Sequence, residues 1–208
     1  MIVHHFTTPI TTPFARKSTQ IYGDLCRLWE KAKIKESAKK PEITGLCRLI
    51  KGYKIMIKVL FVCHGNICRS TMAEYVMKHL VKQSGIESDF FIDSAGTSNE
   101  EHGNPVHHGT QKKLRKEGIP CGNHRARKMR REEYVAFDYI ICMERYNIQN
   151  IMRIIGNDPE HKVQRLLDYT NRPRDIADPW YTGNFDETFD DVMEGCQAFL
   201  SYLMEHLQ

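Results

Sequence analysis

Short apolar runs alternate with longer amphipathic segments along the chain from Lys58 onward. This alternation is typical of buried strands that are connected by helices. The apolar runs predict four strands, at residues 59–63, 90–93, 139–143 and 163–167. Because the connections between the strands are long enough to hold helices, the pattern predicts a parallel sheet.

The amphipathic segments predict the helices. They lie at residues 70–85, 105–117 and 144–155, with a short one near residue 130 and a long one at 185–207. Thr71 and Glu74 have the spacing of a capping box, which predicts that the first helix begins at Ser70 or Thr71. The last helix carries one apolar stripe that predicts core packing: Phe189, Val192, Cys196, Phe199 and Leu203. Together the elements predict an α/β fold, a four-stranded parallel sheet with helices on both faces, doubly wound in the Rossmann-like or flavodoxin-like manner.

The charge is unevenly divided along the chain. The net charge is +4 at pH 7, yet residues 1–55 contain eleven Lys and Arg against four Asp and Glu. We therefore predict a basic N-terminal extension over residues 1–55, flexible or not part of the natural product, and one compact domain over residues 56–208. Such an extension could bind nucleic acid or anionic lipid, but its partner is left open, and the domain itself requires no nucleic acid.

The composition favours a soluble protein of the cytoplasm. No run approaches the roughly 20 apolar residues that a membrane-spanning helix requires, and the N-terminus lacks the apolar core of a secretory signal. The chain has seven cysteines, an odd and scattered set: Cys26, Cys47, Cys63, Cys68, Cys121, Cys142 and Cys196. This arrangement favours free thiols in a reducing compartment.

One segment between the first predicted strand and the first helix places a cysteine and an arginine six positions apart. It runs from Cys63 to Arg69, with the sequence Cys-His-Gly-Asn-Ile-Cys-Arg. The intervening residues let the chain curl once around a tetrahedral oxyanion, with backbone N–H groups pointing inward. The planar guanidinium of Arg69 can then hold two oxygens at once, and the positive surroundings favour a thiolate at Cys63. The segment predicts a phosphate-binding loop with a nucleophile at its base.

A candidate acid follows the fourth predicted strand. Asp178 precedes Pro179, Trp180 and Tyr181 in a segment that we expect to be a loop. The loop would lie at the carboxyl end of the sheet, where open parallel sheets bind ligands. A poor leaving group needs such a positioned acid, and two aromatic side chains beside it can form a slot for a flat ring. The segment therefore indicates an aryl phosphate as substrate.

These segments give the chain a resemblance to the low-molecular-weight protein tyrosine phosphatases of the bacterial type. The resemblance covers residues 56–208 and not residues 1–55. It is carried in order by residues 62–70, 93–97, 103–105, 137–143 and 178–183, and by His124 in a His-x-Ala-Arg setting. It implies hydrolysis of phosphotyrosine in proteins or peptides through a phosphocysteine intermediate, with phosphate as product and without a metal or a cofactor.

The resemblance also implies a role for each residue of the catalytic machinery. Cys63 would be the nucleophile, Arg69 the phosphate clamp, and Asp178 the group that protonates the leaving oxygen and then activates water. The residues that bind the phosphate would be His64, Gly65, Asn66, Ile67, Cys68, Arg69 and Ser70. The substrate slot would be formed by Glu100, Trp180 and Tyr181.

A second group of residues would support this machinery. By resemblance, Asn66, Ser70 and His124 hold the phosphate-binding loop in its shape. Cys68 resembles a second thiol that closes a disulfide onto Cys63 under oxidation and protects it from irreversible oxidation.

Three positions depart from the family pattern. Thr71 stands where proline usually follows the Arg-Ser pair, and because proline there only preorganises a helix start, activity should survive. His64 stands where a hydrophobic residue is common, and we expect it to form part of the wall. Glu100 stands near the place where many relatives carry an aromatic residue, and together with Glu101 it would repel acidic sequences that flank the phosphotyrosine.

Four other functions could use the same loop. An arsenate reductase needs further cysteines in a mobile segment, whereas Cys121 and Cys142 are isolated. A protein-arginine phosphatase tends to carry threonine where Ile67 stands. A phosphocysteine carrier needs no general acid, so Asp178 argues against it, and a module that only binds anions needs no thiolate.

Overall fold

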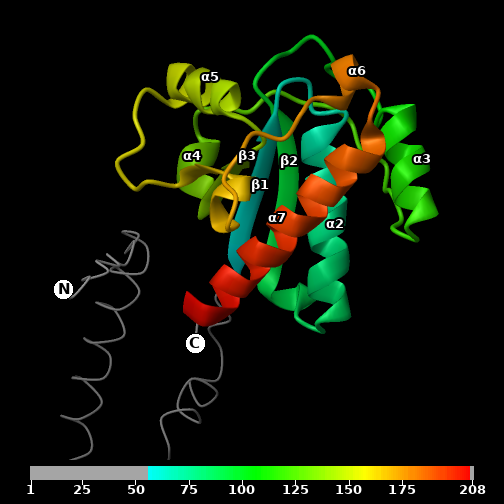
Figure 1. The fold of residues 1–208 in the computed structure, drawn as a ribbon. Coiled ribbons are helices and arrows are strands. Elements are labelled where there is room, and N and C mark those ends of the chain that lie inside the picture. The colour runs from blue at the N-terminus through cyan, green and yellow to red at the C-terminus, as the bar shows by residue number, and fades with distance from the viewer. Residues whose placement is uncertain (1–55, 207–208) are drawn as a thin grey trace, which may run out of the picture. The chain divides into compact units, whose positions relative to one another are not determined.

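The computed structural model describes residues 56–206, and four parallel strands form its sheet (Figure 1). In chain order the strands are β1 (Ile57–Cys63), β2 (Phe90–Gly96), β3 (Tyr139–Cys142) and β4 (Val163–Arg165). Their spatial order is β2-β1-β3-β4. The predicted four-stranded parallel sheet is thus confirmed, while the basic extension predicted at residues 1–55 lies outside the described residues.

The central strand β1 is buried because both of its faces are covered. Its side chains alternate between two hydrophobic cores, with Val59 and Phe61 in one core and Leu60 and Val62 in the other. This explains why β1 has an almost continuous apolar sequence, which strands covered on both faces require.

Helices cover the two faces of the sheet (Figure 1). On one face lie α2 (Arg69–Gln83), α3 (His108–Lys116) and α7 (Phe185–His206), and on the other lie α4 (Glu133–Ala136) and α5 (Arg145–Ile155). The predicted stripe of α7, from Phe189 to Leu203, is buried in the first core. The expectation of helices on both faces is confirmed, and no helix within residues 56–206 is long and apolar enough to span a membrane.

Two short 3₁₀ helices and one short α-helix complete the described fold. They are η2 (Glu87–Asp89), η3 (Leu166–Tyr169) and α6 (Pro179–Thr182). β4 was predicted to continue to residue 167, but it ends at Arg165 because the chain turns into η3. The buried Leu166 and Leu167 of η3 instead pack in the core that contains α7.

The predicted capping box at the start of the first helix is wrong. Helix α2 begins at Arg69, and Cys68 stands at its N-cap without a side-chain cap. The Thr71 hydroxyl donates to the Cys68 carbonyl at 2.8 Å, while the buried carboxylate of Glu74 accepts from Ser94 Oγ at 2.6 Å. Glu74 is therefore bonded to a neighbouring strand and does not cap its own helix.

Helix α3 also begins later than predicted, at His108 instead of residue 105. His107 is its N-cap residue, and its ring Nδ1 accepts from the Gly109 N–H at 3.1 Å. The periodic pattern did not reveal this cap, because histidine is not among the preferred N-cap residues.

The strand order fixes where a ligand can bind. β1 pairs with β2 on one side and with β3 on the other, so the chain leaves β1 at the point where the order reverses. In doubly wound sheets this switch point, at the carboxyl ends of the strands, is the usual ligand site. The segment from Cys63 to Arg69 leaves the sheet at this point.

We predict that Gly195→Val destabilises the protein by about 2–3 kcal/mol, because the core there has no room for a side chain. A Cβ on Gly195 of α7 would lie 2.5 Å from Cγ of Leu166 and 3.2 Å from Cδ2 of Leu167. Urea unfolding would measure the loss. Gln197→Val, at an exposed position of the same helix, should change the stability by only about 0.5 kcal/mol. Equal effects of the two substitutions would contradict the packing described here.

Candidate active site

The segment from Cys63 to Arg69 forms a loop whose sulfur atom lies at its base. Cys63 ends β1 and is only 2% exposed. The N–H of Asn66 donates to Cys63 Sγ at 3.3 Å, and Ser70 Oγ lies 3.1 Å from the same sulfur. Both groups can donate to a thiolate, so they stabilise negative charge on Sγ.

Asn66 gives the loop its shape. Its φ of 62° lies in the left-handed region, which a residue other than glycine adopts only when its surroundings hold it there. Its side-chain amide donates to Ser70 Oγ at 3.0 Å and to Ser94 Oγ at 2.9 Å, and its Oδ1 accepts from the Arg127 N–H at 3.0 Å. His124 Nε2 lies 2.8 Å from the Asn66 carbonyl oxygen and can donate to it. The structure thus brings together the predicted supporting residues Asn66, Ser70 and His124.

Residues of β2 continue this support, and sequence reasoning gave them no role. Ser94 accepts from Asn66 and donates to Glu74, which also contacts Lys78. Gly96 stands opposite Cys63 in the sheet, and a Cβ on it would lie only 2.6 Å from the His64 carbonyl oxygen. The one available signal was that both residues lie in the segment 93–97, which carries the family resemblance.

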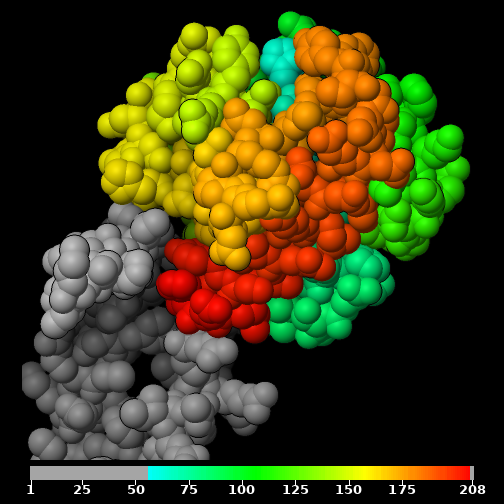
Figure 2. Space-filling model, in the orientation of Figure 1, coloured from blue at the N-terminus to red at the C-terminus, as the bar shows by residue number. Residues whose placement is uncertain are grey.

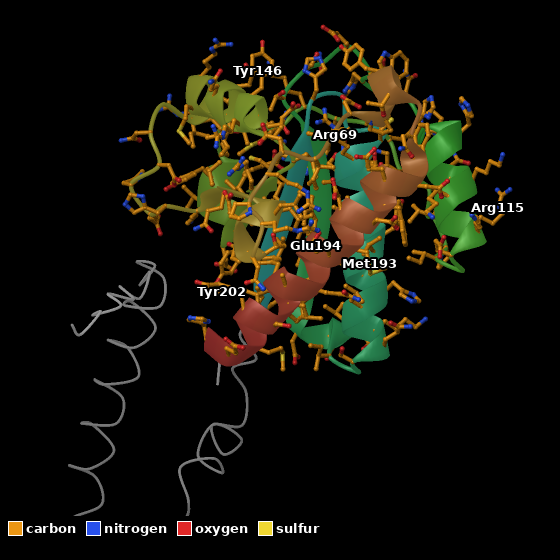
Figure 3. The ribbon with its side chains drawn as sticks, viewed as in Figure 1. Arg69, Arg115, Tyr146, Met193, Glu194 and Tyr202 are labelled. Atoms are coloured by element: carbon orange, nitrogen blue, oxygen red, sulfur yellow. The ribbon has the colours of Figure 1, made fainter. Side chains whose placement is uncertain are left out.

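Arg69 lies at the carboxyl end of the sheet with its guanidinium almost fully buried (Figure 3). Its Nη1 donates to the Ile176 carbonyl at 3.2 Å and lies 2.9 Å from Glu144 Oε1, while its Nη2 lies 2.5 Å from Asp178 Oδ2. Burial opposes the positive charge, but the charge interactions with Cys63, Asp178 and Glu144 outweigh this effect and raise the pKa of Arg69. Nε of Arg69 is buried and has no hydrogen-bond partner within the described residues.

Glu144 is a further residue that sequence reasoning missed. It is separated from the end of β3 by Met143 alone and is the N-cap of α5, where its side chain and that of Asn147 form a capping box. The cap fixes the carboxylate beside Arg69. Its position just after the carboxyl end of a strand was the signal that could have identified it.

Asp178 faces Arg69 from a short helix and not from the predicted loop. Residues 179–182 form the single turn α6, and Asp178 is its N-cap. Asp178 Oδ1 accepts from the Trp180 N–H at 3.1 Å, which leaves Oδ2 to contact Arg69. Pro179 suits this turn, because proline at the first helical position lacks an N–H that would remain unpaired.

These groups surround a pocket of about 120 Å³ above Cys63. It is lined by Cys63, His64, Gly65, Ile67, Cys68, Arg69, Glu100, Glu101, Asp178, Trp180 and Tyr181. Figure 2 shows the cyan segment after β1 reaching the surface between the yellow-green α5 and the orange segment that contains α6. Asn66 and Ser70 are fully buried and do not line the pocket, so of the predicted phosphate-binding residues these two lie behind it.

The mouth of the pocket is acidic and aromatic. Trp180 and Tyr181 are 56% and 84% exposed. Glu100 contacts His64, with 3.2 Å between Oε2 and Nε2, and Glu101 accepts from Asn104 at 2.7 Å. The predicted slot residues therefore all line one pocket, and the departure at His64 is paired with the departure at Glu100.

Cys68 is the second thiol of the pocket. It is buried and free, and burial, together with the charges of Cys63 and Asp178, raises its pKa to about 12. At neutral pH it is therefore a thiol. Cys121 and Cys142 do not line the pocket, so neither is placed to serve as the further cysteine that an arsenate reductase relay needs beyond Cys63 and Cys68.

Comparison with known families agrees with this geometry. The family model described as low molecular weight phosphotyrosine protein phosphatase matches residues 58–208. The chain belongs to this family. The resemblance inferred from the separated sequence segments is thereby confirmed.

The matches between this phosphatase and its individual relatives extend over nearly the whole length of each relative. The low molecular weight protein-tyrosine-phosphatase YfkJ of Bacillus subtilis is 41% identical over 155 residues, which are 74% of this chain and 99% of YfkJ. The PtpA protein of Staphylococcus epidermidis with the same description is 39% identical over 151 residues, 72% of this chain and 96% of PtpA. The crystal structure of YfkJ superposes with a TM-score of 0.72 and covers 76% of this chain and 99% of that one.

One similar structure carries a different name. A Drosophila arginine phosphatase is 32% identical, has a TM-score of 0.65, and covers 70% of this chain and 97% of its own. Structures similar to this chain are thus named both as tyrosine phosphatases and as an arginine phosphatase.

We expect Gly96→Ala to lower phosphatase turnover by about 10-fold or more, because an added Cβ would push the His64 carbonyl and displace the phosphate-binding loop. The steady-state rate with p-nitrophenyl phosphate measures this effect. Gly122→Ala is the matched control, since a Cβ there would lie 3.5 Å from the Tyr75 hydroxyl in ordinary contact. Full activity of Gly96→Ala would show that the loop tolerates the shift and that turnover does not depend on the close approach of Gly96 to the His64 carbonyl.

Proposed function

We propose that this phosphatase hydrolyses phosphotyrosine in proteins or peptides, and aryl phosphates, through a phosphocysteine intermediate on Cys63. The observation that carries the proposal is the convergence of Cys63, Arg69 and Asp178 on one small pocket. A nucleophile, an anion clamp and an acid are the three groups that hydrolysis of a phosphate monoester through a covalent intermediate uses. Inorganic phosphate is the second product.

Arg69 and the loop would bind the phosphoryl group. Nε of the guanidinium has no hydrogen-bond partner within the described residues and Nη2 contacts Asp178, while Glu144 and the Ile176 carbonyl hold Nη1. Phosphoryl oxygens that bind Arg69 compete with Asp178 for Nη2.

The reaction then takes two displacements at phosphorus. Cys63 Sγ attacks as the bond to the aryl oxygen breaks, and Asp178 gives its proton to that oxygen. Asp178, now a carboxylate, accepts a proton from water as the water oxygen attacks phosphorus and the S–P bond breaks. In this second step Cys63 leaves as a thiolate, which the Asn66 N–H and Ser70 hydroxyl stabilise.

The aromatic side chains at the mouth would hold the tyrosine ring. Trp180 and Tyr181 offer apolar area on one segment of the rim, and Glu100 closes the slot from another. The two glutamates at the mouth would disfavour acidic flanking sequences in the substrate. The nucleophilic thiol is best preserved in a reducing compartment such as the cytoplasm, and Cys68 is placed to act as its partner under oxidation.

Phosphoarginine is the second candidate substrate, on the ground of the similarity to the Drosophila arginine phosphatase. Ile67 lines the pocket and argues for the aromatic substrate by its apolar bulk. A panel of tyrosine phosphopeptides and phosphoarginine peptides, incubated with the purified protein, tests the choice by phosphate release.

We predict that the panel shows release from phosphotyrosine with a higher kcat/KM than from phosphoarginine, and that Cys63→Ser abolishes both. The serine oxygen is a poorer nucleophile at neutral pH than a thiolate in the same loop. The Ser201→Ala variant, altered at an exposed position of α7, serves as the control and should keep full activity. Turnover by Cys63→Ser would remove Cys63 from the mechanism, and a preference for phosphoarginine would reverse the substrate assignment.

Asp178→Ala should slow phenyl phosphate far more than p-nitrophenyl phosphate. General acid catalysis contributes about 10²–10⁴-fold, and a phenolate leaving group depends on it more than nitrophenolate does. Comparison of kcat/KM for both substrates in both proteins measures the difference. Asp186→Ala provides a matched control, because this exposed aspartate at the start of α7 does not line the pocket. An equal loss with both substrates would exclude Asp178 as the acid.

A further inference from the structure

His107 lies between two parts of the proposed catalytic machinery, the phosphate-binding loop and the segment that contains Asp178 and Trp180. It has no role in the proposed mechanism itself. Its backbone N–H donates to the Ile67 carbonyl of the phosphate-binding loop at 2.8 Å. It also starts helix α3 as the N-cap residue. The main chain at this residue is therefore fixed both to the loop that carries the nucleophile and to α3.

The ring of His107 contacts the other half of the machinery. It stacks on Phe185, the first residue of α7, with 5.2 Å between centroids and an interplanar angle of 5°. It meets Trp180 of α6 edge to face at 5.6 Å and 69°. Phe185 in turn packs closely against the start of α3, since a Cβ on Gly109 would lie only 2.4 Å from its ring.

Trp180 connects the ring of His107 to Asp178, the proposed acid. Its backbone N–H donates to Asp178 Oδ1 at 3.1 Å, and this bond orients the carboxylate toward Arg69. Trp180 is 56% exposed, so few other groups restrain its side chain. The ring of His107 is the one described aromatic partner of Trp180 within residues 56–206.

The His107 ring is suited to this contact because it is neutral. Its Nδ1 accepts from the Gly109 N–H, which requires an unprotonated nitrogen. Burial, and next the neighbouring His108, lower its pKa, while Glu101 acts in the opposite direction. At neutral pH the ring thus packs as an uncharged aromatic group.

We propose that His107 is a positioning residue for the general acid: its ring holds Trp180, and through it Asp178, in register with the phosphate-binding loop to which its own backbone is bonded. This inference rests on the proposed hydrolytic function. The ring of His107 is what positions Asp178 here, whereas a residue that only caps α3 would need nothing but a hydrogen-bond acceptor.

Two substitutions separate the ring from the cap. His107→Asn keeps an acceptor, since asparagine is a preferred N-cap residue, but it removes the ring. His107→Phe keeps a ring and removes the acceptor. The readout is the ratio of kcat/KM for p-nitrophenyl phosphate to that for phenyl phosphate, which rises when the acid is misplaced because only the poorer leaving group needs the proton.

We expect His107→Asn to raise this ratio by about 10-fold and His107→Phe to keep it within about 2-fold of the wild-type value. His206→Asn, the same change at the exposed last residue of α7, which does not line the pocket, should leave the ratio unchanged. An unchanged ratio in His107→Asn, or an equal rise in His107→Phe, would overturn the proposal. A wild-type protein that hydrolyses neither substrate would refute the proposed function instead.

A second variant keeps the test decisive if His107→Asn folds poorly. Trp180→Leu removes the same contact from its exposed side and should raise the ratio by a similar factor. Combined with His107→Asn, it should add less than a further 2-fold, because both changes break one contact. If the ratio in the double variant rose by the product of the two single effects, the two residues would not share one contact.

Discussion

The left-handed backbone of Asn66 is the constraint on which the site depends. This conformation turns the loop so that the Asn66 N–H points at Cys63 Sγ. Such a conformation costs about 1–3 kcal/mol when the residue is not glycine, and it persists only where the surroundings hold it. Here the side chain supplies the restraint, because its amide bonds to serines of both α2 and β2. The shape of the loop is thus built into the sheet and helix that flank it.

The second constraint is the burial of a guanidinium beside a thiol. Removing one partner of a buried ion pair costs about 3–5 kcal/mol, so the charge of Arg69 needs fixed counter-charges. Glu144 and Asp178 supply them in different ways. Glu144 is held by the cap of α5 and serves as a permanent partner, whereas Asp178 stands on a one-turn helix at the rim. The proposed reaction uses this difference, since only Asp178 has to exchange Arg69 for a proton.

The sequence predicted the parts of the molecule that depend on neighbouring residues along the chain. The strands followed from apolar runs, and Cys63 and Arg69 followed from a spacing within one loop. The contacts that local patterns could not predict are made between distant segments: Arg69 meets a carboxylate 109 positions away, and Asn66 meets His124 across 58 positions. Glu74 was assigned to its own helix because a local pattern could not reveal the strand hydroxyl that binds it. Only the resemblance to a family supplied such long-range information, for His124 and Asp178.

The proposed mechanism requires a covalent bond between phosphorus and Cys63. It is tested most directly by mixing the wild-type protein with an excess of a tyrosine phosphopeptide, quenching within the first turnovers with denaturant, and mapping phosphate by mass spectrometry of the digested chain. A phosphocysteine intermediate would place one phosphate on the peptide that contains Cys63, in an amount that falls as substrate is exhausted. Phosphate on another residue, or rapid turnover with no phosphate on Cys63 at any quench time, would contradict it.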